Sequence, residues 1–273
     1  MKKIKVSVIA LALILLVGAL AGCSKSTVAE GDKKTIKLGI NGAETEVWTY
    51  IKEELAKEDI TLEVISFGDY TRPNLALSEG EIDINSFQHY AFFNKFKEEH
   101  NLDLTAIGET VIAPIGLYSS KIKDVKEIKA NDKIAIPNDA TNGGRTLILL
   151  QTAGLIKVDP AIGNLPTLKD IIENPLNLEI IEVDAATTPR MLDDVAASAI
   201  NSGVAVDAGF TPTIDSIFLE PIDENTKPYI NIFAVRTEDK DNPLYKRLIE
   251  LYQTDKVKEI IDRIYKGSQV TTW

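Results

Sequence analysis

Apolar and polar positions follow two periods along the chain, and the two periods alternate. Residues 35–40 alternate as a short strand does, and an Asn-Gly loop at 41–42 follows them. The next apolar residues fall on one helical face, at Val47, Trp48, Ile51 and Leu55. The same succession of strand, polar glycine-containing loop and helix begins again at Lys133–Ile136. This recurrence predicts two similar α/β lobes.

The remaining patterns predict further elements of the same two kinds. Strands are predicted at 60–67, 82–84, 104–107, 111–118, 178–183, 203–206 and 230–235. Helices are predicted at 75–77, 89–99, 147–154, 189–200, 244–251 and 257–264. In α/β sheets, ligands bind outside the carboxyl ends of the strands. Two facing lobes would therefore place a binding cleft between them.

The N-terminal 22 residues differ from the rest. Lys2, Lys3 and Lys5 precede an uncharged run from Val6 to Ala21, which has the proportions of a secretory signal peptide. The run ends in Leu-Ala-Gly-Cys at 20–23, the lipobox pattern of bacterial lipoproteins, and Cys23 is the only cysteine. We expect a signal peptide at 1–22, a lipid on Cys23 and a flexible tether at 23–34. An ordinary signal peptide with a chance cysteine is the alternative.

Composition and charge exclude several classes of function. The 273 residues include 30 Lys+Arg and 41 Asp+Glu, a formal charge of −11, and loss of residues 1–22 would take it to −14. This acidity argues against nucleic acid as a partner. One cysteine and two histidines exclude a disulfide framework and leave little for a metal site. We therefore expect no cofactor.

The segment Pro137–Arg145 gives the strongest local indication of a ligand-binding site. Gly143 and Gly144 would let the backbone approach a ligand, and the N-terminus of the following helix would offer free N–H groups. Arg145 supplies a planar fork that matches a carboxylate. These residues predict an anchor for a ligand carboxylate. An Asn or Thr helix cap beside a surface arginine fits the same residues equally well.

Four other residues are candidates for a binding site. Phe87 and His89, in the segment 85–90, could line an apolar pocket, although core packing and helix capping explain them as well. Asn201 and Asn231 lie in otherwise apolar runs, where a buried amide needs a hydrogen-bond partner. That partner could be a ligand or a neighbouring backbone group. No serine-hydrolase elbow, Walker A or His-Glu-x-x-His motif occurs, so the sequence predicts a binding protein rather than an enzyme.

Several motifs together resemble one family. They are the lipobox, residues 83–89 (DINSFQH), 137–145 (PNDATNGGR), 149–155 (LLQTAGL), 173–178 (ENPLNL), 189–194 (PRMLDD) and 229–231 (YIN). In this order they resemble the MetQ/NlpA-type lipoproteins, the substrate-binding components of methionine ABC importers. The resemblance covers essentially the whole mature chain.

The resemblance implies a type II-like, two-lobed periplasmic-binding-protein fold with a two-strand hinge. Lobe I would comprise 35–114 and 230–273, and lobe II 115–229. The resemblance further implies a lipid-anchored protein that delivers methionine to a permease and its ATPase. The anchor would lie on the outer face of the bacterial cytoplasmic membrane or on the periplasmic side of an envelope membrane. The ligand's α-groups would meet Asn142, Arg145, Asn201 and Asn231. Its thioether would meet Tyr70, Phe87, His89 and Phe92.

Two departures from the family pattern leave more than one ligand possible. Phe92 stands where many relatives carry a tyrosine, and Ser202-Gly203-Val204 replaces a bulkier stretch that usually includes an aromatic residue. D-methionine, a methionine derivative and a Met-containing dipeptide are therefore alternatives to L-methionine. A surface adhesin or structural lipoprotein with the same fold is the alternative of another class.

Overall fold

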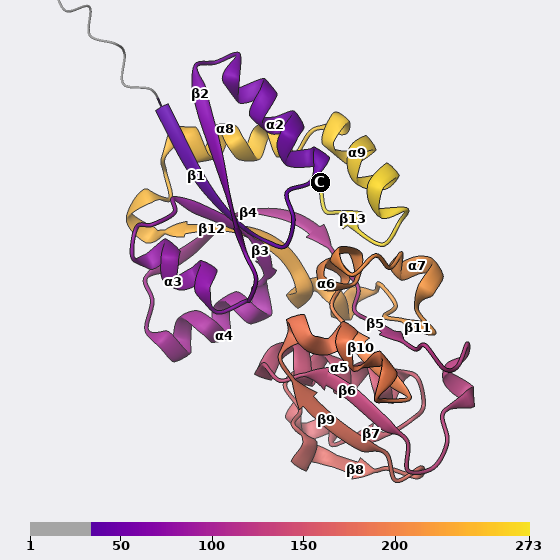
Figure 1. The fold of residues 1–273 in the computed structure, drawn as a ribbon. Helices are drawn as coiled ribbons and strands as arrows, with labels where there is room; N and C mark the ends of the chain where they lie inside the picture. The colour runs from indigo at the N-terminus through magenta and orange to yellow at the C-terminus, as the bar shows by residue number, and fades with distance from the viewer. Residues whose placement is uncertain (1–33) are drawn as a thin grey trace, which may run out of the picture. The chain divides into compact units, whose positions relative to one another are not determined.

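The computed structural model describes residues 34–273, of which Thr35–Trp273 form one compact unit. The predicted signal peptide, Cys23 and the predicted tether up to residue 33 lie outside the described residues. Two sheets organise the fold (Figure 1). The chain leaves the first sheet after Ile112, builds the second between Gly116 and Leu219, and returns to the first at Ile230.

The first sheet has six strands in the order β13-β4-β12-β3-β1-β2. Its strands are β1 (Lys34–Asn41), β2 (Ile60–Phe67), β3 (Ile84–His89), β4 (Leu104–Ile112), β12 (Ile230–Arg236) and β13 (Val270–Thr271). β1 and β3 are parallel, and β12 runs antiparallel between β3 and β4. Alternate side chains of β12 enter different cores, since Phe233 and Val235 join one cluster and Ile232 and Ala234 the other.

Helices cover both faces of this sheet (Figure 1). They are α2 (Glu46–Ala56), α3 (Arg72–Ser78), α4 (Tyr90–His100), α8 (Pro243–Tyr252) and α9 (Asp255–Tyr265), with the 3₁₀ turn η6 (Thr237–Asp239). The larger core joins the apolar faces of α2, α8 and α9 to one side of the sheet. On the other side, Ala76 and Leu77 of α3 and Phe93 of α4 form a second core. All four predicted apolar residues of α2 are buried.

The second sheet has five strands in the order β11-β5-β10-β6-β9. They are β5 (Gly116–Tyr118), β6 (Lys133–Pro137), β9 (Glu179–Val183), β10 (Ala197–Ile200) and β11 (Phe218–Leu219), and β7 (Lys157–Val158) pairs separately with β8 (Ile171–Glu173). β6 is parallel to both of its neighbours. Around this sheet lie α5 (Ala140–Thr152), α6 (Ser202–Asp207), α7 (Pro212–Asp215), η1 (Val125–Glu127), η2 (Pro160–Ile162), η3 (Leu168–Asp170), η4 (Ala185–Asp193) and η5 (Glu224–Tyr229).

Four predicted elements were wrong. The strand expected over 82–84 is instead β3 at Ile84–His89, so it includes the segment that the sequence placed after the strand. The helix expected over 189–200 is the end of η4 followed by strand β10, and the strand expected over 203–206 lies in α6. All four residues of β10 are buried, because it lies between two other strands. A strand buried on both faces shows no period of two, so the sequence cannot separate it from a buried helix. The single strand expected over 111–118 is divided into β4 and β5 by residues 113–115, which include Pro114.

Candidate functional site

A cavity of about 180 Å³ opens beside strands of both sheets. Two of the lining residues come after parallel strands of the second sheet. Asn201 directly follows β10, and Asn142 lies in the helix that comes after β6. The end of β3 supplies other lining residues. All eight residues that the sequence predicted for the site line this cavity: Tyr70, Phe87, His89, Phe92, Asn142, Arg145, Asn201 and Asn231.

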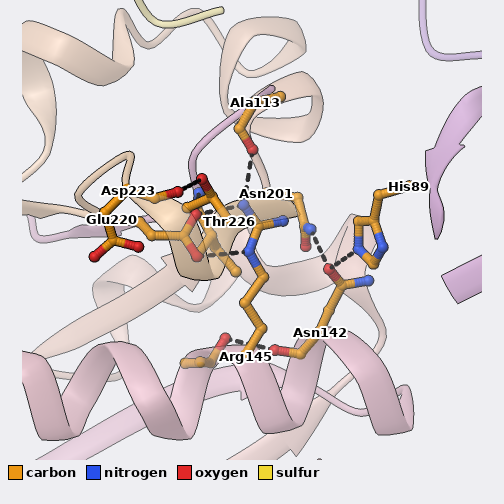
Figure 2. Close-up of polar contacts among 10 residues, drawn as sticks. His89, Ala113, Asn142, Arg145, Asn201, Glu220, Asp223 and Thr226 are labelled. Atoms are coloured by element: carbon orange, nitrogen blue, oxygen red, sulfur yellow. Dashed lines mark hydrogen bonds and ion pairs between the residues drawn. The ribbon is translucent and has the colours of Figure 1, made fainter. Parts of the chain in front are cut away.

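Asn142 is the centre of a hydrogen-bond network in this cavity. Its Oδ1 accepts a hydrogen bond from Nδ2 of Asn201 at 2.8 Å and lies 3.2 Å from Nε2 of His89 (Figure 2). Its own Nδ2 donates to both carboxylate oxygens of Asp139, at 3.1 and 3.0 Å. The amide is 2% exposed and joins residues from both sheets. Asn142 therefore has a fixed orientation before any ligand arrives.

His89 has one defined protonation state in this network. Its Nδ1 accepts from the backbone N–H of Phe92 at 3.0 Å and so caps α4. Nε2 must then carry the proton and donate to Asn142. Burial, and to a lesser extent the nearby positive charge of Arg145, lowers the pKa of the imidazole from 6.5 to about 3. His89 is therefore neutral at physiological pH. It both caps a helix, as one interpretation held, and lines the cavity.

Polar groups without partners mark the same region. Oδ1 of Asn201 and Oγ of Ser202 are buried, and neither has a hydrogen-bond partner within residues 34–273. The side chain of Asn231 also makes no hydrogen bond to any described residue, and it lies opposite His89 in the sheet. An unpaired buried acceptor costs about 1–3 kcal/mol, which a ligand donor would recover. This part of the cavity therefore suits a ligand that carries N–H groups.

Arg145 is the only cation among the described residues that line the cavity. Its Nε donates to Oε1 of Glu220 at 2.8 Å, and its Nη2 donates to Oε2 of Glu220 and, at 3.1 Å, to the carbonyl of Ala113 (Figure 2). The guanidinium carbon lies 4.2 Å from the ring centre of Tyr229. Nη1 makes no hydrogen bond with residues 34–273, so this nitrogen can still receive a carboxylate.

Aromatic rings form the other end of the cavity. Tyr70, Phe87 and Phe92 lie with their ring centres 6.0–6.1 Å apart. His89 adds a fourth ring, 6.4 Å from Phe92 and perpendicular to it. Loss of solvent raises the pKa of the Tyr70 hydroxyl, so it is uncharged at physiological pH. Such a group of rings suits an apolar, polarisable substituent such as a thioether.

A cluster of buried amides joins β3 to helix α3. Oδ1 of Asn74 accepts from Asn85 at 2.9 Å and from Gln88 at 2.7 Å, and Asn74 donates to Gln88 at 2.7 Å. All three side chains are at most 3% exposed. Gln88 lies between Phe87 and His89, so the cluster fixes the strand that presents both rings to the cavity.

The structure corrects two details of the predicted carboxylate anchor. Gly143 and Gly144 do not line the cavity. A Cβ on Gly143 would come within 2.9 Å of the Pro137 carbonyl, so glycine serves packing there. The helix N-terminus is also occupied, because the carboxylate of Asp139 accepts from the backbone N–H of Asn142 at 2.9 Å and caps α5. The cap is therefore neither the Asn nor the Thr that the sequence suggested.

The sequence reasoning missed Glu220 and Tyr229, which hold Arg145. Glu220 follows a two-residue strand in a segment without a recognisable motif, so no local signal distinguishes it from the other acidic residues.

The described residues contain neither a candidate metal site nor a helix that could span a membrane. No group of three His, Cys, Asp or Glu side chains among the described residues could hold a metal ion. Within residues 34–273, no helix combines the length and apolar character of a membrane span.

The fold and the cavity define a small-molecule binding protein of the two-sheet α/β, periplasmic-binding-protein class. The chain belongs to the NlpA lipoprotein family, whose sequence model matches residues 36–273. It is 42% identical over 260 residues to the D-methionine-binding lipoprotein MetQ of Salmonella typhimurium, with 93% of each chain covered. It is 40% identical, with the same coverage, to the protein of that name from Escherichia coli.

Solved structures show the same fold. A nutrient-binding protein from Burkholderia cenocepacia bound to methionine matches with a TM-score of 0.83 and 43% identity over 87% of this chain and all of the other. The substrate-binding protein of a methionine transporter from Streptococcus pneumoniae matches with a TM-score of 0.83 and 41% identity over 88% and 96% of the chains. The predictions of an α/β two-sheet fold and of a binding protein rather than an enzyme are confirmed by these relatives.

Proposed function

We propose that this protein captures methionine, or a close derivative of it, in the cavity between the two sheets. The observation that carries the proposal is the arrangement of unpaired polar groups around Asn142. Nη1 of Arg145 is open to a carboxylate, and Oδ1 of Asn201 is open to an ammonium group. The three rings of Tyr70, Phe87 and Phe92 would accept the thioether. The volume of about 180 Å³ is below the roughly 300 Å³ of the smallest drug-sized pockets, which favours one amino acid over a peptide.

The relatives support the identity of the ligand. The Salmonella and Escherichia proteins are named for D-methionine, and the Burkholderia structure is described as bound to methionine. A zwitterion carries no net charge, which suits a cavity whose arginine is already paired with a carboxylate. Both enantiomers of methionine are candidate ligands, and calorimetry with each distinguishes them.

Ligand capture would be followed by delivery to a membrane transporter. In our proposal the protein works with the permease and ATPase of an ABC importer, as a substrate-binding component. It would consist of lobe I (35–114 and 230–273) and lobe II (115–229), which close on the ligand. The hydrogen bond from His89 to Asn142 supports this, because it joins strand β3 of the first sheet to helix α5, which follows strand β6 of the second. Closure would exclude water and strengthen the contact with Arg145.

Membrane attachment is the second part of the proposal. The chain belongs to a lipoprotein family, and Cys23 follows the lipobox. We propose that residues 1–22 are removed, that Cys23 carries the lipid and that 23–34 tether the protein to the outer face of the cytoplasmic membrane. A Cys23→Ser variant should lose metabolic labelling by palmitate and leave the membrane fraction. Continued labelling of Cys23→Ser would contradict the assignment.

Isothermal titration calorimetry with methionine tests the site. Arg145→Ala and Asn231→Ala should each weaken binding by at least about tenfold, because each removes a polar contact to the ligand. Arg190→Ala is the matched control, since Arg190 is an exposed arginine outside the cavity. Wild-type affinity in both site variants would refute the assignment. Native mass spectrometry of the purified protein would identify any ligand that it retains.

A further inference from the structure

Glu220 does not line the cavity, yet it holds the arginine of the cavity in place. Its two oxygens accept from Nε and Nη2 of Arg145, which makes the pair bidentate. The side chains of Arg145 and Glu220 are 3% and 11% exposed. A bidentate pair of this kind fixes the plane of the guanidinium group, whereas a single contact would let it rotate. Only Nη1 is left for another acceptor.

The same pair touches both connections between the two sheets. In the connection from β4 to β5, the carbonyl of Ala113 accepts from Arg145, and the backbone N–H of Ile115 donates to Oε2 of Glu220 at 3.2 Å. Glu220 itself follows β11 and opens the return connection to β12. That connection ends at Tyr229, whose ring lies against the guanidinium group. Figure 2 shows Ala113 and Glu220 around the end of the Arg145 side chain.

We propose that Glu220 is a positioning residue for ligand recognition, which aims Nη1 of Arg145 at the ligand carboxylate and ties that side chain to both inter-sheet connections. This inference rests on the proposed function, since it takes the ligand to be an amino acid bound through its carboxylate. It adds a residue that acts on the ligand only through Arg145.

A glutamine at position 220 separates positioning from simple packing. The amide has nearly the same size, but it replaces one acceptor oxygen by a donor N–H₂ group. Both oxygens of Glu220 now accept hydrogen bonds, from Arg145 and from Ile115. In Glu220→Gln, one N–H donor must therefore face another, and the guanidinium group has to move. The contact with the ligand carboxylate then loses its geometry, while the aromatic end of the cavity is unaffected.

The test uses three probes in calorimetry: methionine, methioninamide, which lacks the carboxylate, and 4-(methylthio)butanoate, which lacks the ammonium group. In Glu220→Gln, methionine and 4-(methylthio)butanoate should each bind at least about tenfold more weakly. Methioninamide should change by less than about threefold, so the preference for methionine over its amide collapses. Glu224→Gln is the matched control, because it removes an exposed carboxylate from the same connection and should change none of the three affinities.

Other outcomes overturn the inference. Equal losses for methionine and methioninamide would show a general structural role. Tighter binding of 4-(methylthio)butanoate would show that Glu220 merely weakens the charge of Arg145. If the wild-type protein binds methionine no better than methioninamide, the proposed function fails and the inference fails with it. Glu220→Asp keeps a shorter carboxylate and should retain part of the preference, so it provides the test if Glu220→Gln does not fold.

Discussion

The buried imidazole of His89 should make the free energy of unfolding depend on pH. Its pKa is about 3 in the fold, mainly because of burial, against 6.5 for an unperturbed histidine. Protonation would also place an N–H group on Nδ1, which now accepts from the N–H of Phe92. Above about pH 6.5 the ring is neutral in both the folded and the unfolded states. Between about pH 6.5 and 3, the unfolded state binds one proton more than the folded state.

The size of the effect follows from this difference in bound protons. Each pH unit in the window lowers the free energy of unfolding by about 1.4 kcal/mol. Acidification from pH 6.5 to about pH 5 should therefore remove about 2 kcal/mol through His89 alone. Because the pKa of His89 is lowered in the folded state, its contribution to the free energy of unfolding is complete above pH 6.5 and is lost as the pH falls.

Urea denaturation of the wild-type protein and His89→Gln measures this contribution. The variant should be less stable at neutral pH, because glutamine replaces the cap and the contact with Asn142 imperfectly. Its stability should fall between pH 6.5 and 5 by about 2 kcal/mol less than that of the wild type. His100→Gln removes the other imidazole of the chain and leaves the His89 contribution in place, so it is the control.

Nuclear magnetic resonance gives an independent measurement, since the chain has two histidines and the variants assign their signals. The His89 imidazole should not titrate between pH 8 and about pH 5. Equal pH slopes for the wild type and His89→Gln, or a native His89 signal that titrates near pH 6.5, would refute the reasoning.

Three further substitutions test the packing around the site by urea denaturation. Asn142→Ala should cost about 3 kcal/mol, because two buried donors lose their acceptor, and an effect below about 1 kcal/mol would contradict this role. Gly42→Ala should cost about 1–2 kcal/mol, since Gly42 has φ +79° and a Cβ would overlap the Asp207 carboxylate; an unchanged midpoint would count against it. Asn74→Ala should cost roughly 2–4 kcal/mol by removing two of the three side-chain hydrogen bonds of Gln88, and stability equal to wild type would argue against the buried amide cluster.

The residues predicted for the site line one cavity, and for some of them there is a physical reason. The segment 137–145 follows a strand predicted from its apolar pattern, whereas residues 85–89 lie within β3 itself. Parallel strands end at one edge of a sheet, so polar residues after them gather there. Asn201 also follows a strand, but the sequence placed that residue after a helix. The resemblance to the family, rather than the local pattern, supported its place in the site.

Local patterns failed where tertiary contacts decide the structure. The run from Val195 to Ile200 is apolar except for Ser198, and only its place between β5 and β6 makes it a strand. The positive charge of Arg145 was visible in the sequence, but its pairing with Glu220 was not, since 75 residues separate the two. Nothing in the sequence indicates which of 41 acidic residues would meet that arginine.

The sequence by itself determined the classes of element, the order of the two α/β repeats and the residue types at the site. These follow from local periodicity and from turn and cap chemistry, which act over a few residues. Only the tertiary structure decided which polar groups are already satisfied. It pairs Asp139 with the amide of Asn142 and Glu220 with Arg145, and it leaves Oδ1 of Asn201 without a partner. Hydrogen bonds between residues far apart in the chain depend on how the two sheets pack, and this packing determines what the cavity can bind.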